Sequence, residues 1–190
     1  WKDEVKDLRS TCKARPINPK LYEAVKEEFA RLRKYFYIPS DSKVVSPLAI
    51  APKATPPYVR FCGDYAKVNT YIDCPHGVRK NVRDEITKIK GFSRFGEFDM
   101  ANSFHQIRLG EITSNRLSVV TQFETVRPKF LPEGVSPASI ELQKVVDYIF
   151  GDLDWIVAIF DNLLVCANSD KELYERTEVF FDRCVKHNLI

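Results

Sequence analysis

The chain has 190 residues, of which 44% are hydrophobic and 29% are charged, so it can bury a real core and does not have the composition of a disordered protein. Its 29 basic and 26 acidic residues give a net charge of +3, which permits a basic face for nucleic acid but does not require one. No apolar run approaches the length of a membrane span, and the charged N-terminus is unlike a signal peptide.

The five cysteines are spread along the chain and form no C-x-x-C pair. An odd number of cysteines in apolar surroundings predicts reduced, mostly buried thiols and therefore an intracellular setting. The last residues are apolar and lack a stop signal, so we expect the chain to be a piece cut from a longer polyprotein.

The first third of the chain predicts a helix followed by a β-hairpin. Asn18-Pro19 can begin a helix in which apolar residues recur every three or four positions over 21–36. Two strand-like segments follow at 44–52 and 58–63, and the Pro-rich segment 55–57 separates them as a turn.

The middle of the chain alternates between helix and strand signals. A short helix is predicted over 82–89 and is closed by Gly91. Segments 104–109 and 117–123 are predicted strands, and Ser136-Pro137 opens a helix that runs to Phe150. A capping box, Ser169-Asp170-Lys171-Glu172, begins the last helix. The elements predict an α+β protein with an antiparallel sheet backed by helices.

The most informative stretch is 156–167, two apolar runs interrupted only by Asp161-Asn162, which is typical of a tight β-hairpin. Taken alone, Asp161 is an ordinary turn residue. A second acid, Asp99, ends another short apolar segment, however, and two acids at strand ends repel each other unless a cation neutralises them. The pair therefore predicts a shared magnesium site.

Four blocks occur in a fixed order: VRFCGDYAKVN at 59–69, GEFDMANSFHQI at 96–107, LPEGVSPA at 131–138, and the hairpin at 156–167. Together they resemble the reverse transcriptase of gypsy-type LTR retrotransposons or related retroelement polyproteins. The order and the strand and helix context of all four blocks are more specific than any one of them.

The resemblance implies the fingers and palm of the right-hand polymerase fold, without a thumb. Residues 1–43 would be an N-terminal lead and helix, 44–92 the fingers, and 93–190 the palm, which includes the helix near 136–150. Because the thumb, connection and RNase H portions would belong to the parent polyprotein, we do not expect processive synthesis from this fragment alone.

The resemblance implies that Asp99 and Asp161 are the metal ligands, with Asn162 beside them as a further catalytic position. They would hold two Mg²⁺ ions, with Mn²⁺ as the alternative, for transfer of a nucleotide to the primer 3′ hydroxyl. The implied function is RNA- or DNA-templated DNA synthesis with a primed template and deoxynucleoside triphosphates as partners.

The resemblance also assigns nucleotide-binding residues. Arg60 matches an arginine that contacts the incoming triphosphate, and Lys53 lies where the family often has a phosphate-binding lysine. Phe104 matches the aromatic gate against a 2′ hydroxyl, although a core role is the simpler interpretation of an isolated phenylalanine. Glu133-Gly134 matches the block that contacts the nascent base pair, where glycine allows a close approach of the backbone.

Two departures from the family pattern favour an alternative function. The hairpin reads Phe160-Asp161-Asn162, so an amide replaces the second aspartate of the usual pair, and Glu97 on the same strand face as Asp99 is a candidate substitute ligand. Glu133 replaces the usual glutamine and adds negative charge near a nucleotide. The alternative is a degenerate palm that binds nucleic acid or a protein partner without polymerising.

In either case we expect an intracellular protein, in a cytoplasmic retroelement particle or in the nucleus.

Overall fold

The computed structural model describes residues 1–2, 9–74 and 82–190. The chain divides into two compact units that interleave along the sequence. The first unit consists of Trp1–Cys74 and Ile107–Ala138, and the second unit consists of Pro75–Gln106 and Ser139–Ile190. The predicted boundaries of fingers and palm stay a prediction, and their part at 75–81 lies outside the described residues.

The helix predicted near the N-terminus is confirmed. A 3-10 turn, Pro19–Leu21 (η1), leads into α1, Tyr22–Tyr35. The Asn18 side chain accepts a hydrogen bond from a backbone N–H of this turn, as expected of a residue that begins a helix. The apolar stripe of α1 is buried at Val25, Phe29 and Leu32.

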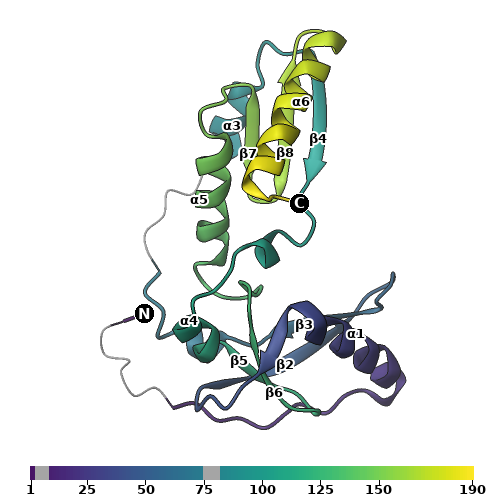
Figure 1. The fold of residues 1–190 in the computed structure, drawn as a ribbon, viewed down its shortest axis with the longest axis vertical. Coiled ribbons are helices and arrows are strands. Elements are labelled where there is room, and N and C mark those ends of the chain that lie inside the picture. Colours follow the sequence, from purple (N-terminus) through teal and green to yellow (C-terminus); the bar gives the residue numbers. More distant parts are fainter. Residues whose placement is uncertain (3–8, 75–81) are drawn as a thin grey trace. The chain divides into compact units, whose positions relative to one another are not determined.

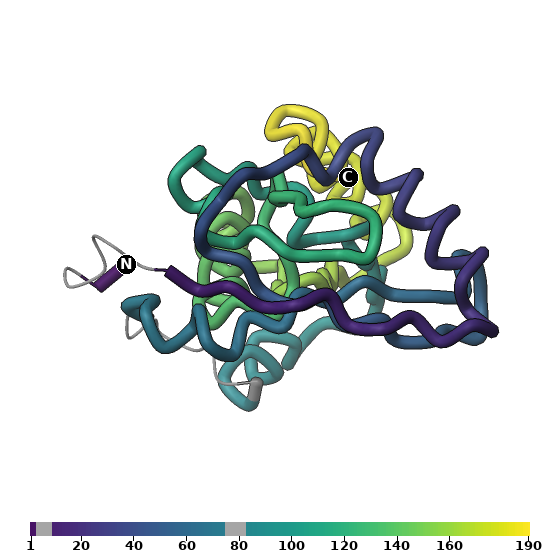
Figure 2. The backbone as a smooth tube through the Cα atoms, turned by 90° about the horizontal axis from the view of Figure 1, so that it is seen from below, coloured from purple at the N-terminus to yellow at the C-terminus, as the bar shows by residue number. Residues whose placement is uncertain are grey.

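The segment before α1 is extended. It can be followed in Figure 2 as the dark purple tube that leads into the coils of α1. At its start, Ser10 forms an isolated parallel bridge with Val44, and the Val45 N–H donates to the Ser10 carbonyl at 2.7 Å. The N-terminal lead is therefore tied to the sheet of the first unit.

The sheet of the first unit has the strand order β1-β6-β5-β2-β3. Its strands are β1 (Tyr37–Pro39), β2 (Val45–Pro52), β3 (Val59–Gly63), β5 (Ser118–Val120) and β6 (Thr125–Pro128). β2 and β3 form the predicted antiparallel hairpin, whereas β2 pairs with β5 in parallel. A parallel pair needs a long connection, so no local sequence signal marks it. Two short helices, α2 (Ala66–Asn69) and α4 (Glu111–Arg116), were not predicted.

The second unit contains an antiparallel sheet with the order β4-β8-β7. Its strands are β4 (Arg94–Asp99), β7 (Ile156–Ile159) and β8 (Asn162–Ala167). The helices of this unit are α3 (Val82–Lys88), α5 (Ala138–Phe150) and α6 (Asp170–His187), and Figure 1 shows them beside the sheet. Buried Phe180 of α6 stacks on Phe98 of β4 and on Phe150 of α5, with ring centroids 4.8 and 5.2 Å apart.

The signals at the ends of the helices are confirmed. The Ser169 side chain accepts from the Glu172 N–H at 3.2 Å, and the Glu172 carboxylate accepts from the Asn168 N–H at 2.7 Å, so the predicted capping box begins α6. After α3, Gly91 has a φ of 98°, a value that L side chains rarely adopt. The predicted α+β fold, with sheets backed by helices, is confirmed.

The strand predicted over 104–109 is wrong. Ser103–Gln106 form a 3-10 turn (η2) instead. Asn102 adopts a left-handed φ of 48°, and its carbonyl accepts the His105 N–H at 2.8 Å, so the chain turns directly after β4. Phe104 and Ile107 are both partly exposed, so their apolar character here indicates neither an extended backbone nor a buried strand.

The prediction of mostly buried thiols is also wrong. All five cysteines lie in the described part of the chain and carry free thiols, as expected, but only Cys166 is buried. Cys12, Cys62 and Cys184 are partly exposed, and Cys74 is exposed.

Within the described residues, no helix is both long enough and apolar enough to cross a membrane.

Candidate active site

The candidate active site of the second unit lies at the end of its sheet. Asp99 is the last residue of β4 and pairs with Asn162, the first residue of β8. The next residue, Met100, is buried and donates its N–H to the Asp161 carbonyl at 3.0 Å. The register therefore brings Asp99, Asp161 and Asn162 to one edge of the sheet, as the sequence predicted.

The hairpin that carries Asp161 turns one residue earlier than its sequence predicts. Ile159 pairs with Asn162, so the two residues of the turn are Phe160 and Asp161, and Asn162 belongs to β8. Phe160 has a φ of 56°. Asn162 is in the ladder because both neighbouring strands, β4 and β7, pair with it.

A buried layer supports this edge of the sheet. Leu163, which follows Asn162 and pairs with Phe98, is 2% exposed, and Val165 is completely buried. Asp99 and Asn162 are exposed, and Asp161 is partly exposed. The polar side chains are thus open to solvent while the backbone that holds them continues into the core.

The donor atoms at this edge suit a hard cation. Two carboxylates and one amide oxygen are oxygen ligands, and Mg²⁺ commonly takes one or two protein carboxylates and completes its shell with water and substrate phosphates. In the described ranges, no group of three or more His, Cys, Asp and Glu side chains is arranged to hold a metal ion. Glu97, exposed on β4 two residues before Asp99, is the next acid on this strand face.

Phe104 lies shortly after Asp99 in the second unit. It is partly exposed on η2, in a loop that Gln106 closes by donating to the Ala101 carbonyl at 2.9 Å. The same Gln106 side chain accepts the Ile190 N–H at 2.9 Å. Phe104 is therefore neither a strand residue nor a fully buried core residue.

The other predicted site residues belong to the first unit, where Arg60 and Glu133 lie close together. Arg60, on β3, places its guanidinium 3.8 Å from the Glu133 carboxylate, and the two side chains are 57% and 47% exposed. Cys62 lies next to this pair. Burial raises the pKa of the Cys62 thiol, the negative charge of Glu133 raises it further, and Arg60 lowers it.

The Gly134 turn lies against the end of β3. Gly134 has a φ of 89°, and a Cβ at this position would lie 3.4 Å from the Gly63 carbonyl oxygen. Asn69 of α2 holds the turn from both sides, because its amide donates to the Gly134 carbonyl and accepts the Ser136 N–H, each at 2.9 Å. The positive φ of Gly134 therefore favours glycine at this position, because L side chains rarely adopt it.

Lys53 is exposed in the turn between β2 and β3. Its N–H donates to the Tyr58 carbonyl at 2.7 Å, just beyond the last pair of the hairpin, Pro52 with Val59. Its backbone position is thus defined by the turn, while its side chain extends into solvent.

Comparisons with known proteins identify the fold. No family model matches the sequence. The chain is 26% identical over 158 residues to the retrovirus-related Pol polyprotein from transposon 412 of Drosophila melanogaster, covering 80% of this chain and 13% of that protein. It is 24% identical over 179 residues to an uncharacterized protein of Caenorhabditis elegans, covering 90% of this chain and 14% of that protein.

Among solved structures, the prototype foamy virus protease-reverse transcriptase (CSH mutant) matches with a TM-score of 0.87 and 18% identity, over 98% of this chain and 25% of that one. A foamy viral protease-reverse transcriptase in complex with dsDNA matches with a TM-score of 0.84 and 14% identity, over 98% of this chain and 40% of that one. The chain has the fold of a reverse transcriptase. The predicted resemblance to a retroelement reverse transcriptase is confirmed, and the chain spans only about one seventh of the curated relatives that it matches.

Two residues of this reverse transcriptase fold were missed from the sequence. Asn69 ends the block at 59–69 without a predicted role, and Gln143 lies in the segment predicted only as a helix. Gln143 is buried and bonds to the backbone of the hairpin turn. Glu141, Lys144 and Asp147 of the same helix are also polar, so no local pattern distinguishes Gln143.

Proposed function

We propose that this chain carries out template-directed DNA synthesis as part of a retroelement polyprotein. The reaction joins the primer 3′ oxygen to the α-phosphorus of a deoxynucleoside triphosphate and breaks the bond to pyrophosphate. The observation that carries the proposal is the register of β4 and β8, which pairs Asp99 with Asn162 and sets Asp161 beside them.

Asp99 and Asp161 would hold two Mg²⁺ ions, and Asn162 would add a neutral oxygen ligand. Magnesium bound there would lower the pKa of the primer hydroxyl and neutralise the triphosphate and the leaving pyrophosphate. The protein side chains supply the fixed oxygen atoms for this, and the exposure of Asp99 and Asn162 leaves them open to substrate phosphates.

The first unit would bind the nucleotide. Arg60 offers a planar guanidinium suited to two phosphate oxygens, and Lys53 offers a second positive charge on an exposed turn. Gly134 would bring backbone close to the nascent base pair, and Glu133 beside it would contact the same region. In the second unit, Phe104 would exclude a 2′ hydroxyl by its bulk and so favour deoxynucleotides.

The solved structures that this chain resembles support a nucleic-acid template. Foamy viral protease-reverse transcriptase has been solved in complex with dsDNA and, in a structure that matches this chain with a TM-score of 0.81 and 16% identity, with an RNA/DNA hybrid. We therefore propose a primed RNA or DNA template as the partner of this chain.

The test is the addition of one nucleotide to a primer on RNA and DNA templates, with Mg²⁺ or Mn²⁺. Single addition is chosen because it does not require processive synthesis. We expect addition by the wild-type chain, and loss in Asp99→Ala and in Asp161→Ala. Asp154→Ala is the matched control, because Asp154 is an exposed acid of the same unit that precedes β7. Addition that survives both active-site substitutions would overturn the proposal.

A degenerate palm that binds nucleic acid or protein without polymerising is the second candidate. The observations that favour it are the amide at Asn162, which lowers the negative charge of the metal site, and the Arg60–Glu133 contact, in which a carboxylate lies where a phosphate would bind. Binding of a triphosphate that depends on Mg²⁺ separates the two functions. Duplex binding without any metal-dependent triphosphate binding would favour the degenerate palm.

A further inference from the structure

The turn that presents Asp161 has a backbone conformation that its sequence does not favour. Phe160 is at a φ of 56°, in the left-handed region, where a residue with a Cβ is crowded by its own backbone. Hairpins with a two-residue turn usually place Gly, Asn or Asp at such a position. A bulky residue persists there only when the surrounding structure holds it.

Gln143 of α5 holds the Phe160 side of this turn from outside the hairpin, while the Met100 N–H holds the Asp161 side. The Gln143 Oε1 accepts the Phe160 N–H at 2.9 Å, and its Nε2 donates to the Ala158 carbonyl at 3.2 Å. The side chain is only 7% exposed. One buried side-chain amide therefore binds the carbonyl of Ala158 and the N–H of Phe160. Phe160 is the residue that directly precedes Asp161.

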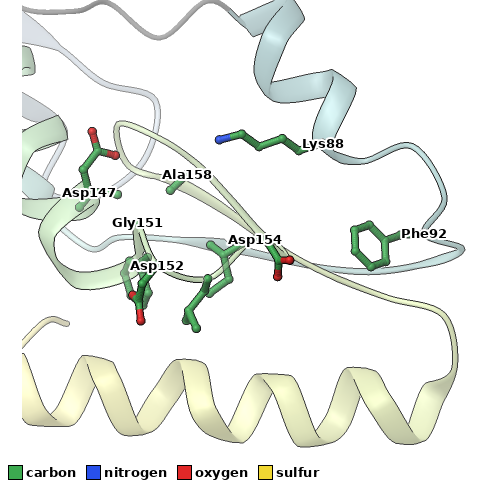
Figure 3. A pocket seen from close by; sticks show the side chains of 11 residues that line it. Lys88, Phe92, Asp147, Gly151, Asp152, Asp154 and Ala158 are labelled. Atoms are coloured by element: carbon green, nitrogen blue, oxygen red, sulfur yellow. The ribbon is translucent and has the colours of Figure 1, made fainter.

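Asp147, one helical turn further along α5, fixes which end of the Gln143 amide faces the turn. Its carboxylate accepts from Gln143 Nε2 at 2.9 Å. Because an ionised carboxylate and the Ala158 carbonyl only accept hydrogen bonds, both require the amide nitrogen, which leaves the oxygen for Phe160. Asp147 and Ala158 both line a cavity of about 810 Å³ in the second unit, and Figure 3 shows the two residues there.

We propose that Gln143 is a positioning residue that holds Phe160 in its left-handed conformation and thereby keeps the Asp161 carboxylate in place to bind a metal ion together with Asp99. This inference rests on the metal site of the proposed function, but not on polymerisation. A purely structural role is the competing account, since a buried glutamine also has to satisfy its own polar atoms. The two accounts differ in whether metal binding depends on Gln143 at constant fold stability.

The experiment measures Mn²⁺ binding to the chain by paramagnetic broadening of the backbone amide signals of Asp99 and Asp161 in NMR spectra. Gln143→Met removes the hydrogen bonds and keeps a similar length. We expect the Mn²⁺ concentration for half-saturation to rise about tenfold, which corresponds to the loss of about 1.4 kcal/mol of buried hydrogen bonding. Amide hydrogen exchange at Phe160 should become faster in the same variant. Lys144→Met on the same helix, where Lys144 is exposed, is the matched control and should change neither value.

Phe160→Gly separates positioning from general support of the core. Glycine adopts a positive φ without strain, so a turn with glycine at this position depends less on the amide of Gln143. In the Phe160→Gly background, Gln143→Met should therefore raise the half-saturating Mn²⁺ concentration only about two- to threefold. An unchanged tenfold effect would show that Gln143 does not act through the turn and would overturn the inference.

The remaining outcomes are also decisive. Equal Mn²⁺ affinity in wild type and Gln143→Met, with only a lower melting temperature, would establish the purely structural role. If Gln143→Met does not fold, the Mn²⁺ titration is made on Gln143→Asn, which shortens the side chain by one methylene and keeps the amide. A half-saturating Mn²⁺ concentration that rises in this variant supports positioning, and an unchanged one overturns it. Mn²⁺ binding without nucleotide addition would overturn the proposed function alone. No broadening at Asp99 and Asp161 in the wild type would overturn the metal site and this inference together.

Discussion

The two units place their candidate functional side chains by different means. In the second unit, Asp99, Asp161 and Asn162 are set by strand register above buried Leu163, and a buried glutamine holds the turn beside them. In the first unit, the side chains of Arg60 and Glu133 are about half exposed and contact each other at 3.8 Å.

This difference separates two kinds of site. Metal ligands have to be held within narrow limits, so they gain from a backbone that the core constrains. Groups proposed to bind a triphosphate, such as Arg60, gain from side chains that can move, and an exposed ion pair such as Arg60–Glu133 is weak enough to open when a ligand binds. The second unit should therefore be sensitive to changes in its core, and the first unit to changes of charge.

The largest expected effect comes from the core below the proposed metal ligands, Asp99 and Asp161. Leu163→Ala should destabilise the second unit by about 2–5 kcal/mol, because it removes a buried side chain and leaves a cavity. Hydrogen exchange at the Val165 amide measures this locally. Ile112→Ala, an exposed aliphatic position in the first unit, is the control and should change stability by less than about 0.5 kcal/mol. Similar losses in both variants would show that the positions of Asp99 and Asp161 do not depend on the core in this way.

The amide at Asn162 is the next test. Asn162→Asp adds a third carboxylate at the edge of the sheet and should lower the Mg²⁺ concentration for half-maximal triphosphate binding about tenfold, since ligand charge raises cation affinity. A titration of triphosphate binding against Mg²⁺ measures it. Nucleotide addition that appears only in this variant would mean that the natural chain is disabled at one residue. A weaker affinity in Asn162→Asp would instead show that the acids here repel each other more than they bind the metal.

The ion pair in the first unit should have a smaller effect. Glu133→Gln frees Arg60 and should tighten triphosphate binding about two- to fivefold, in line with the roughly 0.2–1 kcal/mol of an exposed pair. An independent measurement uses Cys62, whose thiol pKa is raised by burial and by Glu133. Removal of the Glu133 charge should lower this pKa, so alkylation of Cys62 at neutral pH should become faster. An unchanged alkylation rate would show that Glu133 is not close to Cys62 in solution.

The smallest effect concerns an ion pair in the second unit between partly exposed Arg183 and exposed Asp152. Arg183 donates to the Asp152 carboxylate, with one contact at 2.7 Å, and holds the Asp152 pKa below its ordinary value. A lowered pKa in the folded state contributes stability at pH values above the ordinary pKa and loses it as the pH falls through the folded pKa. Asp152→Asn should therefore lower the melting temperature slightly at neutral pH and not in acid. A difference that grows in acid would contradict the pairing.

Local patterns predicted most of the elements. The α1 stripe, the β2–β3 hairpin and the capping box of α6 were predicted correctly because each depends on neighbours within a few residues. The 104–109 strand failed because one left-handed residue, Asn102, turns a segment whose apolar residues look extended. The hairpin turn was displaced by one residue, because pairing with β4 draws Asn162 into the ladder.

The sequence by itself determined which acids end the strands, that Asn162 departs from the family pattern, and which fold the order of the blocks implies. Only the tertiary structure decided that Asp99 pairs with Asn162, that Glu133 contacts Arg60, and that Gln143 reaches the Phe160 turn. These contacts join residues 17 to 73 positions apart in the chain, and such pairings depend on how whole elements pack, whereas helix and turn signals are local.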